Sequence, residues 1–348
     1  MNGVQALRFI AAMMVVIYHV SLHYTARKGE LDVTFLKYFL YSGVDIFFVI
    51  SGLVIWESTN NNTTAKEFFL KRTWRIYSGY LPALAICGLL IAISSSDKAK
   101  SAISVLPSIL LLPIPPQERM LDVSWTLTYE LIFYIAMAAC LLFKRRSTVI
   151  ALLLAGGIYG VISSLAGAKQ ANFAAGYLTS PLLFEFAIGC FISFILSKYK
   201  TKSPKVYVAA GFSLILMAGI AAFKLKYLPG GKIGEAARVI AFGVPAALIV
   251  YGCACLRAQG TIADSLKRLG DASYAIYLLH MPVLVFTWHA LPVAANVWFF
   301  FKNLEIGAIF IVVTTVLLSL AYYKFIERPL IKAPFISHKK TEPTVVTQ

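Results

Sequence analysis

Two residues whose side chains can do chemistry lie inside the first apolar segment of the chain, Arg8 and His19 in the run 4–22. Ionisable groups at membrane depth are costly and usually face a bundle interior or a wet cavity, so they mark candidate functional sites. The two residues are eleven positions apart, which is about three helical turns, so they share one helix face at a separation of about 16 Å. Because a histidine titrates near neutral pH, His19 is suited to act as a general base.

Three further ionisable residues are expected at a similar depth. A helix rise of about 1.5 Å per residue places Asp45, Glu130 and His280 in the same outer half of the membrane as His19. Asp45 or Glu130 would then orient the His19 imidazole and stabilise its cation, and spacing does not choose between them. Each has a structural alternative: Asp45 as a partner of Arg8 or a backbone amide, Glu130 as a partner of a histidine, and His280 as a hydrogen bond between helices rather than a substrate contact.

A basic cluster opens the third apolar segment. Arg72 and Arg75 are three residues apart and share a helix face, and paired guanidiniums suit phosphate. The alternative is an anchor for lipid headgroups. Ser51 is expected to hydrogen-bond a ligand or its own helix rather than to act as a nucleophile, because His19 is too far above it to serve as its base. Trp125 is a further candidate for substrate binding.

The composition indicates a membrane protein. The 348 residues are 59% hydrophobic and 14% charged, with a mean hydropathy of +0.75, whereas a soluble domain is about half apolar and a quarter charged. The first segment is too long for a cleaved signal peptide. The net charge of +16 would suggest nucleic acid in a soluble protein, but here topology explains it and no nucleic acid is expected. The five cysteines show neither disulfide nor metal-site spacing.

Ten apolar runs are long enough to span a membrane. They lie at 4–22, 36–57, 76–94, 124–143, 148–166, 178–197, 206–223, 237–256, 271–291 and 304–324. The stretch 101–117 is also apolar but contains four prolines, and it is interpreted as an interfacial or re-entrant loop, with an eleventh span as the alternative. The sequence therefore predicts an all-α polytopic protein.

The distribution of basic residues predicts the orientation. With a cytoplasmic N-terminus, the inside loops hold nineteen Lys and Arg residues and the outside loops hold ten, which favours both termini inside. An eleventh span would exchange the sides of all later loops, so the excess of basic residues inside would be lost. The chain is divided into a membrane domain over 1–333 and a short polar cytoplasmic tail over 334–348, expected to be disordered.

Several motifs, in this order, resemble the acyltransferase 3 family of membrane acyltransferases, from Arg8 to Pro329. They are Arg8 followed by His19, Gly43–Gly52, Arg72–Arg75, Ser124–Glu130, Ser273–His280 and Glu327–Pro329. The chain looks most like the branch that decorates bacterial exopolysaccharide, capsule or O-antigen. It departs from the family at Leu53, where Phe is usual, and at Thr126, where Ser is frequent.

The resemblance implies transfer of an acyl group, usually acetyl, from cytoplasmic acyl-CoA to a sugar hydroxyl across a bacterial inner membrane. The implied partners are acyl-CoA, a polysaccharide or lipid-linked oligosaccharide, and membrane lipids, with no permanent cofactor and no metal. Arg72 and Arg75 would bind the CoA phosphates, and the pantetheine arm would pass Arg8 towards His19. Direct transfer and an acyl-histidine intermediate both stay open. The alternative function is a transporter or flippase of a lipid-linked sugar, which the lack of a visible inverted repeat disfavours.

Overall fold

A computed structural model describes residues 1–28, 34–60, 62–94, 103–168, 172–225, 231–256, 260–289 and 304–336. In these ranges nine helices are long and apolar enough to cross a membrane, and a tenth span is formed if the pair Ala263–Asp271 and Ser273–Thr287, bent by 58°, is counted as one. The prediction of an all-α polytopic protein with about ten spans is confirmed.

The elements have the following bounds. The first half comprises α1 (Asn2–Lys28), α2 (Lys37–Leu40), α3 (Gly43–Glu57), α4 (Ala65–Ser94), α6 (Val105–Ile109), α7 (Trp125–Leu142) and α8 (Thr148–Leu165). The second half comprises α9 (Phe173–Leu178), α10 (Leu183–Lys198), α11 (Pro204–Leu225), α12 (Gly231–Arg238), α13 (Val244–Cys255), α14 (Thr261–Asp271), α15 (Ser273–His289), α18 (Leu304–Tyr322) and α19 (Arg328–Ile336).

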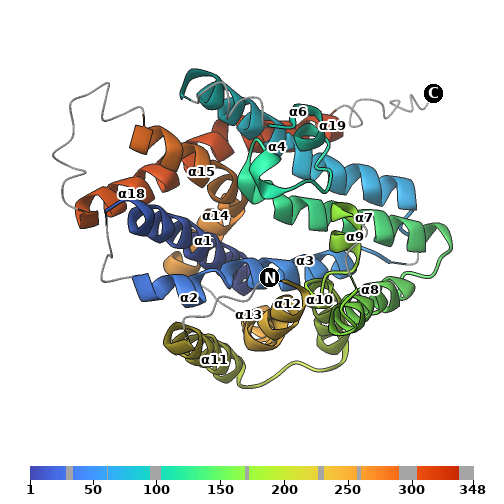
Figure 1. The fold of residues 1–348 in the computed structure, drawn as a ribbon. Helices are drawn as coiled ribbons and strands as arrows, with labels where there is room; N and C mark the ends of the chain where they lie inside the picture. Colours follow the sequence, from blue (N-terminus) through green and yellow to red (C-terminus); the bar gives the residue numbers. More distant parts are fainter. Residues whose placement is uncertain are drawn as a thin grey trace, which may run out of the picture.

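Helices α1 and α3 occupy the centre of the bundle, with α4 and α7 on one side and α11 and α13 on another (Figure 1). Helices α3 and α10 pack closely at two glycines. A Cβ added at Gly52 would lie 2.1 Å from the Phe186 carbonyl oxygen, and one added at Gly189 would lie 2.1 Å from the Val49 carbonyl oxygen. Because neither glycine carries a side chain, the two backbones approach directly.

The proline-rich stretch does not form a span. It contains the short helix α6 and the start of a 3₁₀ turn, Pro116–Glu118, and a second 3₁₀ turn, Asp122–Ser124, follows before α7. Arg119 is 4% exposed and donates hydrogen bonds to the carbonyl oxygens of Leu112 and Ile114 and to the Tyr177 hydroxyl. The loop is therefore anchored inside the bundle by the Arg119 side chain.

The C-terminal part returns to the start of α4. A π-helical turn, Tyr323–Glu327, connects α18 to α19, and the Trp74 indole donates a hydrogen bond of 2.9 Å to the Leu330 carbonyl. The predicted tail 334–348 begins inside α19, which continues to Ile336, and the residues 337–348 lie outside the described ones.

Candidate active site

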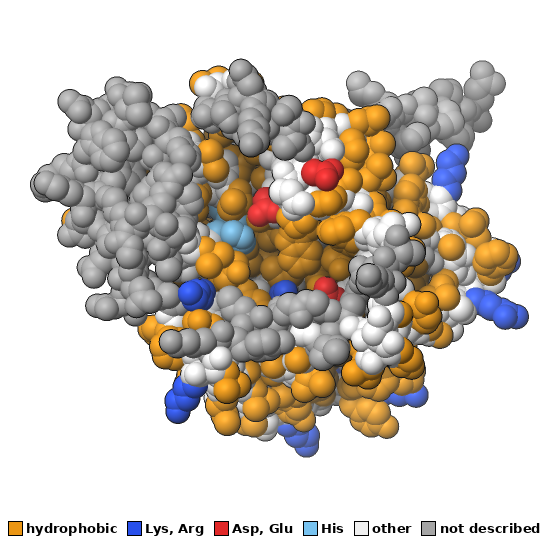
Figure 2. All heavy atoms as spheres, in the orientation of Figure 1, with side chains coloured by type: hydrophobic (Ala, Val, Ile, Leu, Met, Phe, Trp, Pro, Cys, Tyr) orange, Lys and Arg blue, Asp and Glu red, His pale blue; other side chains and the backbone are white. Residues whose placement is uncertain are grey.

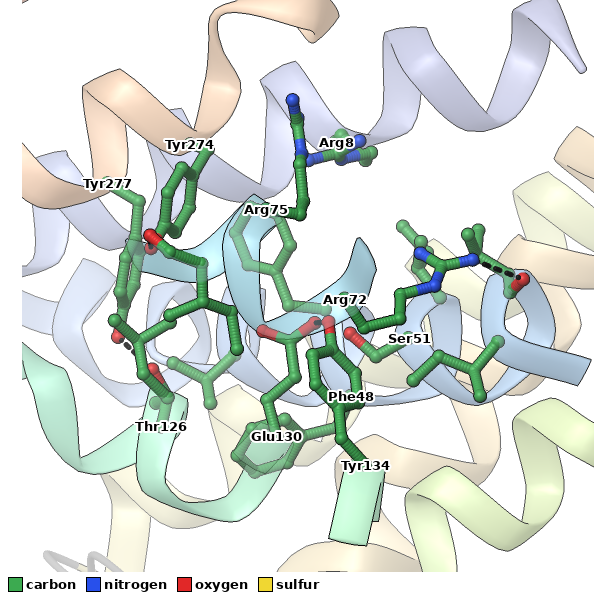
Figure 3. A pocket seen from close by; sticks show the side chains of 17 residues that line it. Arg8, Phe48, Ser51, Arg72, Arg75, Thr126, Glu130, Tyr134, Tyr274 and Tyr277 are labelled. Atoms are coloured by element: carbon green, nitrogen blue, oxygen red, sulfur yellow. Dashed lines mark hydrogen bonds between the residues drawn. The ribbon is translucent and has the colours of Figure 1, made fainter. Parts of the chain in front are cut away.

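A cavity of about 120 Å³ lies between α1, α3, α4, α7 and α15. Its polar lining comes from five helices, as Figure 3 shows, and consists of Arg8, Ser51, Arg72, Arg75, Thr126, Glu130, Tyr134, Tyr274 and Tyr277. Three of these side chains are guanidiniums and one is a carboxylate. Because the cations outnumber the acid, the cavity favours an anionic ligand.

A second, wider cavity of about 590 Å³ adjoins the first, and both are lined by Arg72 and Arg75. The rest of its lining is mostly polar and consists of Ser58, Asn60, Asn62, Thr63, Glu67, Phe68, Lys71 and Ile331. The two arginines therefore stand at the junction of a wide polar cavity and a narrow, more apolar one. The sequence prediction that they form one cluster is in accord with this placement.

The two junction arginines have weak internal partners. Arg72 donates a hydrogen bond of 3.3 Å to the Val54 carbonyl, and an Nη1 atom of Arg75 lies 3.7 Å from the Glu327 carboxylate. Glu327 is fully buried, and neither of its oxygens has a hydrogen-bond partner among the described residues. Arg75 is 34% exposed, so its remaining N–H groups can reach a ligand in either cavity.

Arg8 and Glu130 both line the narrow cavity. Glu130 accepts a hydrogen bond of 2.6 Å from the Tyr134 hydroxyl on the next turn of α7, and Figure 3 shows both beside Phe48. Arg8 interacts electrostatically with Arg75 and Glu130, and its Nη1 donates to the Gln5 amide oxygen at 3.4 Å. Arg8 thus adds a third guanidinium to the site.

The structure differs from the expectation that Glu130 shares the depth of His19. Glu130 lines the cavity with Arg8, which lies eleven positions before His19 on the same helix. The reason is the start of α7, which the sequence estimate placed at the outer membrane boundary. Ser124 is fully buried and Val123 is 2% exposed, so α7 begins inside the bundle and carries Glu130 deeper.

Asp45 is bound by a residue that the sequence analysis did not connect with it. Arg238 donates to both carboxylate oxygens, from Nε at 2.9 and 3.2 Å and from Nη2 at 2.8 Å. Asp45 is fully buried and Arg238 is 14% exposed. The structural partner of Asp45 is therefore Arg238, in place of the suggested Arg8, and Asp45 does not line either cavity described above.

His19 and His280 lie side by side, with ring centroids 4.9 Å apart. The Nδ1 atom of His19 is 2.9 Å from the Val15 carbonyl, and that of His280 is 2.6 Å from the Tyr277 carbonyl. Because a carbonyl oxygen only accepts, these contacts assign the proton of each neutral ring to Nδ1 and leave a lone pair on Nε2. His19 is half-buried and thus retains the basic nitrogen that general base catalysis requires.

A row of rings connects the narrow cavity with the histidines. Phe47 and Tyr277 both line the cavity, with ring centroids 5.9 Å apart, and the Tyr277 ring lies 5.7 Å from that of His280. The Tyr277 hydroxyl hydrogen-bonds Thr126 at 2.7 Å and the Val123 carbonyl at 2.9 Å. The wall between the cavity and the histidine pair is therefore about one side chain thick.

The two remaining candidates are placed differently. Ser51 lines the narrow cavity. Trp125 is half-buried and packs against Phe48 and Tyr129, with ring centroids 6.1 and 5.9 Å away, and it is not among the lining residues of the two cavities.

Sequence reasoning missed the polar residues that complete the site. Tyr134, Tyr274 and Tyr277 were treated as part of apolar spans, although their hydroxyls all make hydrogen bonds. Asp122 was assigned to a loop, but it interacts electrostatically with His19. The available signal was position: Tyr134 follows Glu130 by one helical turn, and Asp122 lies two residues before Ser124 of the Ser124–Glu130 motif.

Comparison with known proteins identifies the family. Residues 1–324 match the model of the acyltransferase domain. The chain belongs to this family. The acyltransferase is 29% identical over 311 residues to the exopolysaccharide production protein ExoZ of Rhizobium meliloti (strain 1021), covering 84% of the chain and 89% of the relative. It is 23% identical over 310 residues to nodulation protein 10 of Rhizobium leguminosarum bv. viciae, covering 81% of the chain and 83% of the relative.

The acyltransferase is also similar to the peptidoglycan O-acetyltransferase OatA of Listeria monocytogenes, with 25% identity over 391 aligned positions. That alignment covers 97% of the chain but 57% of the relative. No solved structure matches the chain. The resemblance inferred from the ordered motifs is confirmed.

Proposed function

We propose that this multi-pass acyltransferase is an O-acetyltransferase of the bacterial inner membrane. It takes an acetyl group from cytoplasmic acetyl-CoA and passes it to a hydroxyl of a cell-surface polysaccharide or its lipid-linked precursor. The observation that carries the proposal is the pair of adjoining cavities that meet at Arg72 and Arg75.

The two cavities fit the two parts of the donor. Acetyl-CoA has a bulky phosphorylated head and a thin, mostly uncharged pantetheine arm. The wide cavity offers Lys71, Arg72 and Arg75 to the phosphates, and guanidiniums bind phosphate oxygens in pairs. The narrow cavity has room for the arm and would lead the thioester past Arg8 and Ser51 towards α15.

His19 takes the proton of the acceptor hydroxyl. Its Nε2 lone pair abstracts the proton while the hydroxyl oxygen attacks the thioester carbonyl, and the proton then passes to the departing CoA thiolate. Glu130 keeps Arg8 and Tyr134 in place within the donor cavity, and Trp125, which packs against Phe48, is the aromatic side chain that we expect to stack on a sugar ring.

The acceptor class is inferred from the relatives. ExoZ is named for exopolysaccharide production and OatA for O-acetylation of peptidoglycan. Both names concern glycans at the cell surface, and for this chain we infer a glycan hydroxyl as the acceptor and acetyl as the transferred group.

The test is acetyl transfer by the purified acyltransferase in detergent. The protein is mixed with acetyl-CoA labelled in the acetyl group and with extracellular polysaccharide from the source bacterium, and both free CoA and labelled glycan are measured. We expect equal amounts of the two products, and a loss of about 10²–10⁴-fold in His19→Ala at unchanged thermal stability. Lack of thioester consumption, together with movement of a lipid-linked sugar across proteoliposomes, would instead establish a transporter.

A further inference from the structure

The partner of the His19 imidazole is the feature that the proposed function leaves open. A protonated imidazole needs a group that accepts its proton in a hydrogen bond, and in hydrolases a carboxylate does this. The two carboxylates expected in that role are occupied elsewhere. Asp45 is held by Arg238, and Glu130 lines the donor cavity with Tyr134.

His280 is an ionisable side chain of another helix whose ring packs directly against that of His19, in addition to the contact of 5.0 Å that His19 makes with its own neighbour in the chain, Tyr18. The two histidine centroids are 4.9 Å apart, with the rings inclined by 52°. His280 is 1% exposed, and its Nε2 atom has no hydrogen-bond partner among the described residues. Leaving a buried hydrogen-bond acceptor without a donor costs free energy. We therefore infer that the Nε2 atom of His280 is hydrogen-bonded only when another group brings a proton to it.

The two histidines cannot hydrogen-bond each other while both are neutral. Their Nδ1 atoms are committed to the carbonyls of Val15 and Tyr277, so both Nε2 atoms are acceptors. One added proton changes this, because a protonated His19 becomes a donor at Nε2 and His280 is then the neighbouring acceptor. The pair as a whole therefore takes up one proton beyond the two that its Nδ1 atoms already carry.

We propose that His280 is the positioning residue of His19, and that the histidine pair shares the proton taken from the acceptor hydroxyl. This inference rests on the proposed function. As the hydroxyl oxygen bonds to the acetyl carbon, its proton moves to His19 Nε2, and the new N–H is shared in a three-centre hydrogen bond between that oxygen and His280 Nε2. When the carbon–sulfur bond breaks, the proton leaves the pair for the CoA thiolate, so the pair returns to its neutral state.

Tyr277 fixes the second ring of the pair. Its backbone carbonyl holds His280 Nδ1, and its hydroxyl is fixed by Thr126 and Val123 at the start of α7. The same Tyr277 side chain lines the donor cavity. The tautomer of His280 is thus set by a residue whose opposite end faces the proposed donor.

Figure 2 shows a hollow in the face of the molecule that it displays, where a histidine and acidic side chains border an apolar surface. Asp122 is exposed and interacts electrostatically with His19, so it is the competing candidate for the role assigned to His280. The experiment must therefore separate the two residues.

The kinetic test compares His280→Leu, His280→Gln and Asp122→Asn in the acetyl transfer assay. A glutamine retains a side-chain oxygen that accepts a hydrogen bond, and a leucine does not. We expect His280→Leu to lower kcat about 10–100-fold, the effect of one hydrogen bond to a charged group. The KM for acetyl-CoA and the Tm in detergent should stay near the parent values, and His280→Gln should recover part of kcat.

A second measurement works without turnover, so it separates this inference from the proposed function. The five histidines are labelled with ¹⁵N in the ring, and the His19 signals are assigned by their loss in His19→Gln. We expect both rings as Nδ1–H tautomers at neutral pH and a shift of the His19 Nε2 signal in His280→Gln. An unchanged His19 signal, a loss of Tm without a loss of kcat, or a larger loss of kcat in Asp122→Asn would overturn the proposal.

Discussion

At the scale of single residues, the arginines differ in how firmly the protein holds them. Arg238 clamps Asp45 through three hydrogen bonds, whereas Arg75 is 3.7 Å from its buried acid and Arg72 meets only a backbone carbonyl among the described residues. A guanidinium carries five N–H donors. Arg72 and Arg75 thus keep donors available for a ligand, while Arg238 is committed to holding α3 against α12.

Arg72→Ala and Arg75→Ala should each weaken CoA binding. Each change removes a charge-assisted contact with phosphate of about 1.5–3 kcal/mol, so we expect the Kd for CoA to rise roughly 10–150-fold. Lysine should restore only part of the affinity because it lacks the planar fork. Calorimetric titration of CoA into the detergent-solubilised protein measures both effects.

Arg145→Ala is the matched control, since Arg145 is exposed and lines neither cavity. Its Kd should equal that of the parent. If Arg72→Ala and Arg75→Ala also bind CoA as the parent does, the two arginines serve as a lipid anchor and the donor site lies elsewhere.

Glu130→Gln should impair transfer more than assembly. The amide oxygen of glutamine can still accept the hydrogen bond from Tyr134, but the charge that faces Arg8 is lost. We expect a large loss of kcat with an unchanged Tm in detergent. A variant that is destabilised without a specific defect in transfer would make Glu130 a structural residue, and full activity would remove it from the mechanism.

At the scale of elements, the sequence predicts where helices lie better than how deep they sit. Apolar length located the spans. The depth of Glu130 required knowledge that the loop before α7 folds into the bundle around Arg119, which is a matter of tertiary packing. The pairing of Asp45 with Arg238 joins residues 193 positions apart, and helical periodicity carries no information on such a contact.

Gly52→Ala should destabilise the contact between α3 and α10. The added methyl group would lie 2.1 Å from the Phe186 carbonyl oxygen, so the helices must separate at a cost of about 1–3 kcal/mol. We expect a fall in Tm of at least a few degrees, measured by thermal unfolding in detergent.

Gly88→Ala provides the control for the same substitution in a helix. Its methyl group would meet only the Met120 Cε atom at 2.7 Å, the flexible end of a side chain, and alanine is the better helix former by about 1 kcal/mol. Its Tm should be unchanged or higher. An equal fall in Tm in both variants would show that the contact between α3 and α10 at Gly52 is no more sensitive to an added methyl group than Gly88 is.

At the scale of the whole molecule, a count of ten spans in the described residues, together with the charge bias of the sequence, predicts one orientation of the bundle. The number of spans is even only if the bent pair α14 and α15 counts as one span. An even number of spans returns the C-terminal end of the chain to the same side of the membrane as the N-terminus. With both termini inside, Arg72 and Arg75 face the compartment that contains CoA. The proposed direction of transfer therefore depends on the topology.

Cysteine labelling tests the orientation directly. The five native cysteines are replaced, and a single cysteine is introduced either at Arg145 or at Ala168, which are both exposed and flank α8. The excess of basic residues near Arg145 predicts that Ala168→Cys reacts with an impermeant maleimide in intact spheroplasts, whereas Arg145→Cys reacts only after permeabilisation. The reverse pattern would place Arg72 and Arg75 on the side without CoA, and a cytoplasmic donor would then be incompatible with the arginine junction.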